Sequence, residues 1–219
     1  MDSLPCTAMS SLLHAAQLST VATSAGPARV HGEAGTAGLL VLGHGAGGGV
    51  EALDLLAARD AARSLGWSVV RVEQPWRVAG RRIAAPPPRL DAAWSEVLAG
   101  LPRPDGPLVL GGRSAGARVA CRSAAAAGAD GVLALAFPLV PPGTSRTRQA
   151  ELDLVATPVL VVQGGRDAFG CPAEAPGRVV VVVPGADHGF VVRRKDGRSA
   201  QEVSLQIEQV VRGWLQALT

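Results

Sequence analysis

Tyrosine is absent from this chain of 219 residues, aromatic residues make up only 3% of it, and a single lysine, Lys195, stands among 21 basic residues. Proteins that bind nucleic acids usually interleave basic and aromatic residues, and no stretch of this chain does so. The formal net charge is +3, and although an arginine-rich balance can indicate nucleic-acid or acidic-ligand binding, we attribute it to codon usage, because alanine, glycine, proline and valine are equally abundant. We therefore expect no nucleic-acid partner.

Cysteines and long apolar runs are equally scarce. The three cysteines, Cys6, Cys121 and Cys171, are an odd number without the spacing of a metal site, so we expect free thiols and no bound metal. No apolar run reaches the roughly 18 to 20 residues of a membrane-spanning helix, and no basic segment precedes the apolar N-terminal stretch. These absences predict a cytoplasmic protein without membrane contacts.

Apolar segments alternate with helix-like segments along most of the chain. Residues 39–42 are continuously apolar, residues 51–65 place alanine and leucine at helical spacing, and residues 68–73 are apolar again. This βαβ order predicts the α/β fold class, with a mostly parallel sheet and helices on both faces. Further strands are expected from residue 108 and at 132–136, 158–163 and 178–183, and further helices at 90–101, 115–127 and 201–218.

A single domain is expected to comprise residues 19–219. The hydrophobic content of 47% is enough for one core, because a chain of this length buries roughly 70% of its unfolded surface. Residues 1–18 are predicted to form a tail or a short helix, and residues 19–24 and 28–31 two edge strands. The loop at 137–149 is too short for a lid domain.

One glycine-flanked serine carries the strongest functional signal. The apolar run from Leu108 leads into Gly112-Arg113-Ser114-Ala115-Gly116, which fits G-x-S-x-G, the sequence form of a nucleophile elbow. Glycines on both sides let the strand and the following helix approach closely around a tight turn. A chance match is the alternative in a chain with 27 glycines, so the surrounding residues have to decide.

A serine nucleophile needs a base, and the base needs a carboxylate that orients it. Of the four histidines, His188 follows the last predicted strand, which brings it to the same sheet edge as Ser114. Asp167 follows the preceding strand and is the predicted acid. Asp187 is the alternative acid, but adjacent side chains usually point apart, so we expect Asp187 to bind the backbone of its loop.

An anionic intermediate would need two N–H donors. One is the N–H of Ala115, directly after the serine, and we expect the other from Ala46 in the glycine loop at 43–49. That loop also matches the dinucleotide pattern G-x-G-x-x-G loosely, but Glu73 comes late for the acid that binds a ribose. We interpret His44 as a structural residue that holds the loop.

These features together resemble the α/β-hydrolase superfamily from about residue 30 onward, including the chain order Ser114, Asp167, His188. The compact length without a lid is similar to the dienelactone-hydrolase-like branch. The stretches LGHGAGGG, QPWRVAGRR, GGRSAGARVA and VVQGGRDAFG resemble even more the bacterial relatives of the α/β-hydrolase-like subunit of the animal NSL acetyltransferase complex. Dienelactone hydrolases usually carry cysteine as the nucleophile, so serine here argues against their particular substrate.

Arginines lie near the predicted site. Arg77 and Arg81 belong to a loop rich in proline and arginine, and Arg113 lies within the serine motif. Guanidinium groups suit a carboxylate or phosphate, so we hypothesise an anionic substrate. Solvated arginines in an arginine-rich chain are the alternative. Trp76 either lines the pocket or fills the loop.

The function predicted from these residues is that of a serine hydrolase. It would cleave a small ester, thioester or related acyl substrate through an acyl-enzyme, without a cofactor. Two alternatives remain: a non-catalytic α/β-hydrolase-like binding or scaffold protein, and an acyltransferase or lyase that uses the same site.

Overall fold

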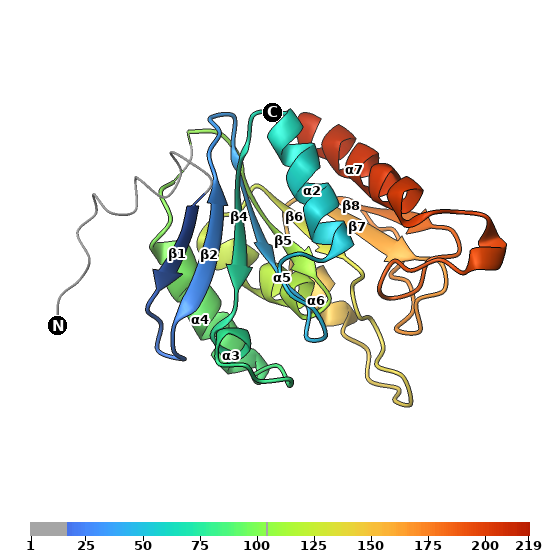
Figure 1. Cartoon of the computed structure of the whole chain (residues 1–219), viewed down its shortest axis with the longest axis horizontal. Coiled ribbons are helices and arrows are strands. Elements are labelled where there is room, and N and C mark those ends of the chain that lie inside the picture. Colours follow the sequence, from blue (N-terminus) through green and yellow to red (C-terminus); the bar gives the residue numbers. More distant parts are fainter. Residues whose placement is uncertain (1–16, 104) are drawn as a thin grey trace.

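Eight strands form one mostly parallel sheet in the computed structural model of the chain (Figure 1). The structure describes residues 17–103 and 105–219. β1 pairs with β2, and β2 with β4, in antiparallel fashion, while all other neighbours run parallel. The strand order is β1-β2-β4-β3-β5-β6-β7-β8, with the bounds β1 Gln17–Val21, β2 Ala28–Glu33, β3 Leu39–Gly43, β4 Ser68–Glu73, β5 Leu108–Arg113, β6 Gly131–Leu135, β7 Val159–Gly164 and β8 Arg178–Val183.

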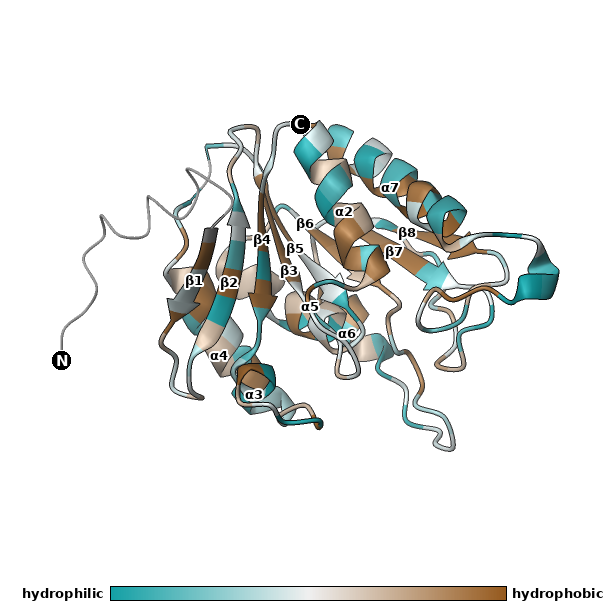
Figure 2. Ribbon diagram, in the orientation of Figure 1, coloured by the Kyte–Doolittle hydropathy of each residue, from teal (hydrophilic) through white to brown (hydrophobic). Residues whose placement is uncertain are grey.

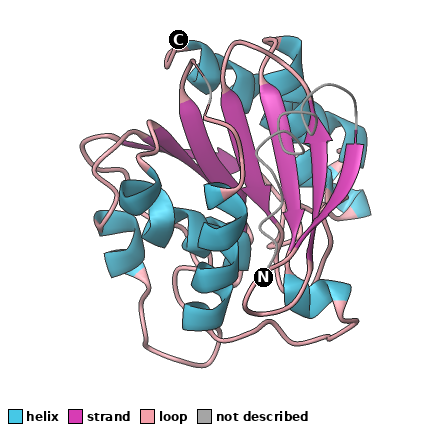
Figure 3. Cartoon of the chain, turned by 90° about the vertical axis from the view of Figure 1, so that its left-hand side faces the viewer, coloured by secondary structure: helices cyan, strands magenta, loops and turns pink. Residues whose placement is uncertain are grey.

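Helices cover both faces of the sheet, as predicted. Their bounds are α2 Leu53–Ser64, α3 Pro75–Val78, α4 Pro87–Ala99, α5 Ala115–Ala127, α6 Gln149–Asp153, the 3-10 helix η2 Arg194–Asp196, and α7 Ala200–Gln216. α4 and α5 pack on one face, and α2 and α7 pack together on the other (Figures 1 and 3). The chain is therefore a three-layer α/β domain.

The continuous apolar strands explain why both faces need helices. In β3, Leu39 and Val41 belong to the cluster under α4 and α5, whereas Leu40 and Leu42 belong to the cluster under α2 and α7. Successive side chains of a strand point to opposite faces, so an all-apolar strand must be buried on both faces of the sheet. The central strands are accordingly coloured as hydrophobic over most of their length in Figure 2.

The C-terminal helix α7 shows the matching pattern on the helical side. Its buried residues, Val203, Ile207, Val211 and Leu215, recur every four positions and face the sheet, while its outer face is hydrophilic (Figure 2). The side chain of Ser199 accepts a hydrogen bond from the backbone N–H three residues later and caps the helix start. The closing helix is thus fixed by its amphipathic sequence.

Several helix and strand boundaries in the structure differ from the predicted ones. The helix expected at 90–101 begins at Pro87, because proline is tolerated in a first helical turn, where its missing N–H would have no partner. α3 and α6, with four and five residues, were not predicted, since helices so short show no periodicity. The strand expected at 19–24 is β1, which ends at Val21. Residues 1–16, most of the predicted tail, lie outside the described residues.

The parallel strands bring distant loops together. β3 and β5 pair Gly43 with Gly112 at their ends, and β7 and β8 pair Gly164 with Val183. The loops that follow these strands therefore meet at one edge of the sheet, the lower edge in Figure 1. This edge carries the candidate functional residues.

Candidate active site

Ser114 occupies the turn between β5 and α5. Its φ of 52° and ψ of −108° lie in a region that residues with side chains seldom adopt, and such strain is concentrated at functional sites. Its N–H donates to the carbonyl of Leu135 at 2.9 Å and ties the turn to β6. Gly116 permits the contact between α5 and β3, because a Cβ there would overlap the carbonyl of Gly43. The turn has the form of a nucleophile elbow.

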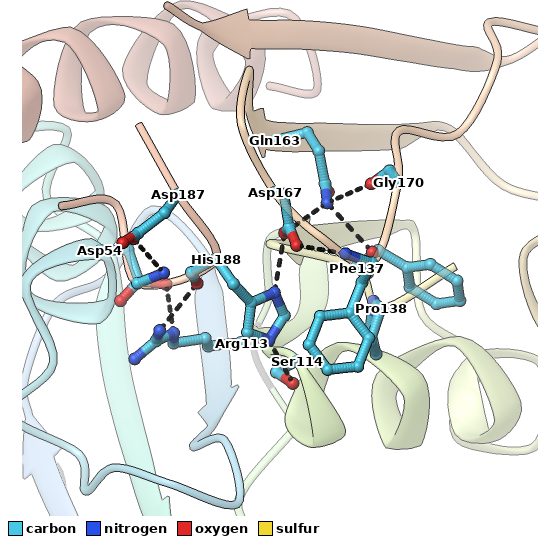
Figure 4. A network of polar contacts seen from close by, with 12 residues as sticks. Asp54, Arg113, Ser114, Phe137, Pro138, Gln163, Asp167, Gly170, Asp187 and His188 are labelled. Carbon is cyan, nitrogen blue, oxygen red and sulfur yellow. Dashed lines mark hydrogen bonds and ion pairs between the residues drawn. The ribbon is translucent and has the colours of Figure 1, made fainter. Parts of the chain in front are cut away.

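His188 lies in the loop after β8 with its ring beside Ser114 (Figure 4). Its Nε2 is 3.0 Å from Ser114 Oγ, and its Nδ1 is 2.7 Å from Oδ2 of Asp167. The ring of Phe169 packs on the imidazole with the centroids 4.3 Å apart. The His188 side chain is 25% exposed, whereas that of Asp167 is fully buried. The structure thus brings Ser114, His188 and Asp167 together as predicted.

The carboxylate of Asp167 is held by protein donors on both oxygens. Besides the contact with His188, Oδ2 accepts a hydrogen bond from the side-chain amide of Gln163 at 2.7 Å. Oδ1 accepts one from the backbone N–H of Phe169 at 2.8 Å. Hydrogen bonds to a carboxylate are charge-assisted and comparatively strong, so they fix its orientation toward the imidazole.

Gln163 is a site residue that the sequence analysis missed. Its amide nitrogen also faces the carbonyl oxygens of Phe137, at 3.2 Å, and Gly170, at 2.8 Å (Figure 4). The available signal was an amide at the end of the otherwise apolar β7, where the side chain is fully buried. A buried amide needs partners, so such a residue indicates a polar network.

Asp187, the alternative acid, binds the backbone of its own loop, as expected. Its Oδ1 accepts hydrogen bonds from the N–H groups of Gly189 and Val191 at 2.8 and 3.0 Å. These contacts shape the loop that presents His188. Asp187 therefore has a local structural role.

The glycine loop after β3 lies against the serine. A Cβ on Gly45 would be 3.4 Å from that of Ser114. The N–H groups of Ala46 and Ala115 donate to no protein acceptor within residues 17–103 and 105–219.

His44 holds this loop, as the sequence analysis proposed. Its Nε2 accepts a hydrogen bond from the N–H of Gln74 at 3.0 Å, and its Nδ1 lies 2.8 Å from the carbonyl of Gly45. Both contacts are satisfied by the neutral ring with the proton on Nδ1. Burial lowers the pKa of His44, which favours this form at neutral pH.

The structure places the guanidinium of Arg113, which the sequence predicts to contact the substrate, against two protein groups. Its Nη2 donates to the carbonyl of His188 at 2.8 Å, and its Nε lies 3.5 Å from Oδ2 of the buried Asp54 (Figure 4). The guanidinium is therefore engaged by the protein. Sequence reasoning missed Asp54, because a carboxylate in the first turn of a helix is usually a solvated residue that favours the helix dipole.

Arg77, Arg81 and Trp76 lie in the segment after β4. Within the described residues, the guanidinium groups of Arg77 and Arg81 have no ion pair or hydrogen bond, and both side chains are exposed. Trp76 is buried, and its ring centroid is 5.3 Å from that of His44. It borders a surface hollow of about 510 Å³ that Arg81 also lines. The Trp76 side chain is thus packed inside its loop and also forms part of the wall of this hollow.

The two described cysteines are free, one buried and one exposed. Burial raises the pKa of Cys121 to about 12, so this thiol is a small core group. Cys171 is exposed.

In residues 17–103 and 105–219, no three His, Cys, Asp or Glu side chains cluster as metal ligands would. None of the helices in that part of the chain is long and apolar enough to span a membrane.

Fold and site together define an α/β protein in which serine, histidine and aspartate meet at the carboxyl edge of a parallel sheet. The sequence profile of the family described as "Alpha/beta hydrolase domain" matches residues 36–216. The chain therefore belongs to the α/β-hydrolase family. No curated protein sequence matches it.

Solved structures with the same fold include a serine hydrolase described as lacking a lid. A lidless α/β serine hydrolase from Xanthomonas campestris is 22% identical, with a TM-score of 0.66 over 91% of this chain and 95% of the other. An esterase from Pyrobaculum calidifontis is 18% identical, with a TM-score of 0.62 over 98% of this chain and 90% of the other. Mouse alpha/beta hydrolase domain-containing protein 10 is 14% identical, with a TM-score of 0.68 over 93% and 100%. At these identities the likeness establishes the compact hydrolase fold.

Proposed function

We propose that the protein is a serine hydrolase that cleaves an ester, thioester or related acyl compound through an acyl-enzyme. The observation that carries this proposal is the pair of distances from His188, 3.0 Å to Ser114 Oγ and 2.7 Å to Asp167 Oδ2. Both lie within the hydrogen-bond reach that a nucleophile, its base and the orienting acid require. The hydrolases among the structural neighbours support the same class.

Proton transfer follows from the ring orientation. To accept the hydroxyl proton at Nε2, His188 must carry its own proton on Nδ1, where it donates to Asp167. Ser114 Oγ attacks the acyl carbon as Nε2 takes the proton, and His188 then returns that proton to the departing alcohol or thiol. Water repeats the sequence on the acyl-enzyme and releases the acid.

The tetrahedral intermediate carries a negative oxygen. We assign its two donors to the N–H groups of Ala115, at the start of α5, and Ala46, in the glycine loop. Each lacks a protein acceptor within the described residues, and the positive end of the α5 dipole adds to the stabilisation. Such preorganised donors lower the barrier because they need no rearrangement during the reaction.

We further propose that the substrate is small and carries an acidic group. The segment from Gln74 to Leu90, which follows β4 and runs into α4, contains four arginines and no acidic residue. Arg81 lines the hollow bordered by Trp76, and Arg77 is exposed close by in sequence. We propose that these arginines bind a carboxylate or phosphate of the substrate at the rim of the site.

Hydrolysis of p-nitrophenyl esters by wild-type protein and Ser114→Ala tests this function. We expect kcat to fall by about 10⁶-fold, the scale observed when a triad serine is lost. Ser145→Ala, which alters an exposed serine outside the site, serves as the matched control and should keep full activity. Turnover retained by Ser114→Ala would refute the assignment.

The same assay separates the alternative functions. A non-catalytic binding protein would hydrolyse none of the esters. An acyltransferase would turn over faster when an alcohol acceptor is added, with the acyl group recovered on that alcohol. A hydrolase releases the free acid at a rate that is independent of the acceptor.

A further inference from the structure

The guanidinium of Arg113 lies between the two loops that complete the proposed site. Its Nη2 donates to the carbonyl of His188 at 2.8 Å. A Cβ on Gly48, in the glycine loop, would lie 3.6 Å from Nη1, and one on Gly189, beside His188, would lie 3.5 Å from Nη2. One side chain therefore binds the histidine loop and lies beside the glycine loop, and its own backbone directly precedes Ser114.

Asp54 forms an ion pair with this guanidinium. The carboxylate is 1% exposed, and its Oδ2 lies 3.5 Å from Nε of Arg113. Burial raises the pKa of Asp54, while Arg113, the N–H groups of the first turn of α2 and His188 act in the opposite direction. A buried carboxylate without a charged partner destabilises the fold. The pairing with Asp54 therefore keeps the guanidinium of Arg113 in its position.

The hydrogen bond from Arg113 to the carbonyl of His188 is the third contact that holds this histidine. The ring is oriented by Asp167, and the loop is shaped internally by Asp187 through Gly189 and Val191. Neither contact connects the backbone of His188 to the serine turn. The hydrogen bond from Arg113 to the His188 carbonyl makes this connection.

We propose that Arg113 and Asp54 form a positioning pair that keeps His188, the glycine loop and Ser114 in register for the hydrolase reaction proposed above. The pair acts through the backbone of the histidine loop and does not touch the substrate. Since a misplacement of about 1 Å in a catalytic group costs about 100-fold in rate, loss of this link should lower kcat and leave KM nearly unchanged.

Four variants test the pair: Arg113→Met, Arg113→Lys, Asp54→Asn and the double variant Arg113→Met with Asp54→Asn. Arg113→Met should lower kcat about 10- to 100-fold on a neutral ester and should also lower the melting temperature. Arg113→Lys keeps a charge and a donor and should recover part of kcat. Arg194→Met, at an exposed arginine in η2, is the matched control.

The double variant separates positioning from simple charge burial. It removes the unpaired buried carboxylate, so we expect the melting temperature to recover while kcat stays low, because the His188 carbonyl still lacks its donor. A double variant with wild-type kcat would overturn the proposal, as would full kcat in Arg113→Met.

A substrate contact has a different signature. If Arg113 bound an acidic group, Arg113→Met would raise KM for an acidic ester alone and leave the neutral ester unaffected, and this result would also overturn the proposal. An inactive wild-type protein whose serine is unreactive would instead contradict the hydrolase function itself. The two failures are therefore distinguishable.

Discussion

Gly116→Ala should disrupt the proposed site through the addition of a single methyl group. The new Cβ would lie 3.0 Å from Cα of Gly43 and closer still to its carbonyl carbon and oxygen, whereas ordinary van der Waals contact begins at 3.4 Å. All three are backbone atoms, so no side-chain rotation can relieve the overlap. α5 and β3 must therefore move apart.

The size of the effect follows from what the two elements carry. α5 begins directly after Ser114, and β3 leads into the loop with the N–H of Ala46. A separation of up to about 1 Å between them should cost about 100-fold in kcat/KM, and the overpacking should destabilise the fold by about 1 to 3 kcal/mol. Ester hydrolysis and urea unfolding measure the two effects on the same preparation.

Gly213→Ala is the control for this experiment. Gly213 lies within α7, and a Cβ there would meet nothing within 4 Å. Alanine should stabilise that helix by about 1 kcal/mol and leave hydrolysis unchanged. If Gly116→Ala proved as stable and active as the wild type, the close contact between β3 and α5 would be wrong.

Three further results are expected. Gln163→Glu places a carboxylate 2.7 Å from that of Asp167 and should lower kcat at least about tenfold; an unchanged kcat would contradict the network. Burial raises the pKa of Glu151, but its two arginine partners on α5 outweigh this effect and hold the pKa below 4.5, so acid unfolding should begin at higher pH in Glu151→Gln. The ion pairs stabilise the fold above pH 4.5 and are lost as pH falls through the lowered pKa. Native protein should react with iodoacetamide at Cys171 and not at Cys121, as peptide mass mapping would show.

The elements that sequence predicts well are those with a strong local signal. The apolar β5, the glycines around Ser114 and the long periodic α7 lie close to where the sequence places them. Asp167 and His188 could be chosen because parallel strands end at one edge, so residues that follow two strands must meet there. The fold class and the central triplet of side chains are therefore readable from residue order alone.

The roles that the sequence did not predict depend on contacts between separate segments of the chain. Arg113 looked like a substrate ligand because nothing in the sequence links it to Asp54 or to the His188 carbonyl, which lies 75 residues away. Gln163 was missed because its partners lie both in the loop that follows its own strand and at Phe137, 26 residues away, and no local pattern links the two. Buried polar groups acquire their partners only in the folded chain, and local patterns do not specify them.

The most direct test of the proposed chemistry is labelling of the folded protein with a fluorophosphonate, followed by peptide mapping. Such probes phosphonylate a serine only when a neighbouring base activates it. We predict a single adduct on Ser114 that is lost in His188→Asn. A folded protein that remains unlabelled, or one labelled on another serine, would contradict the account.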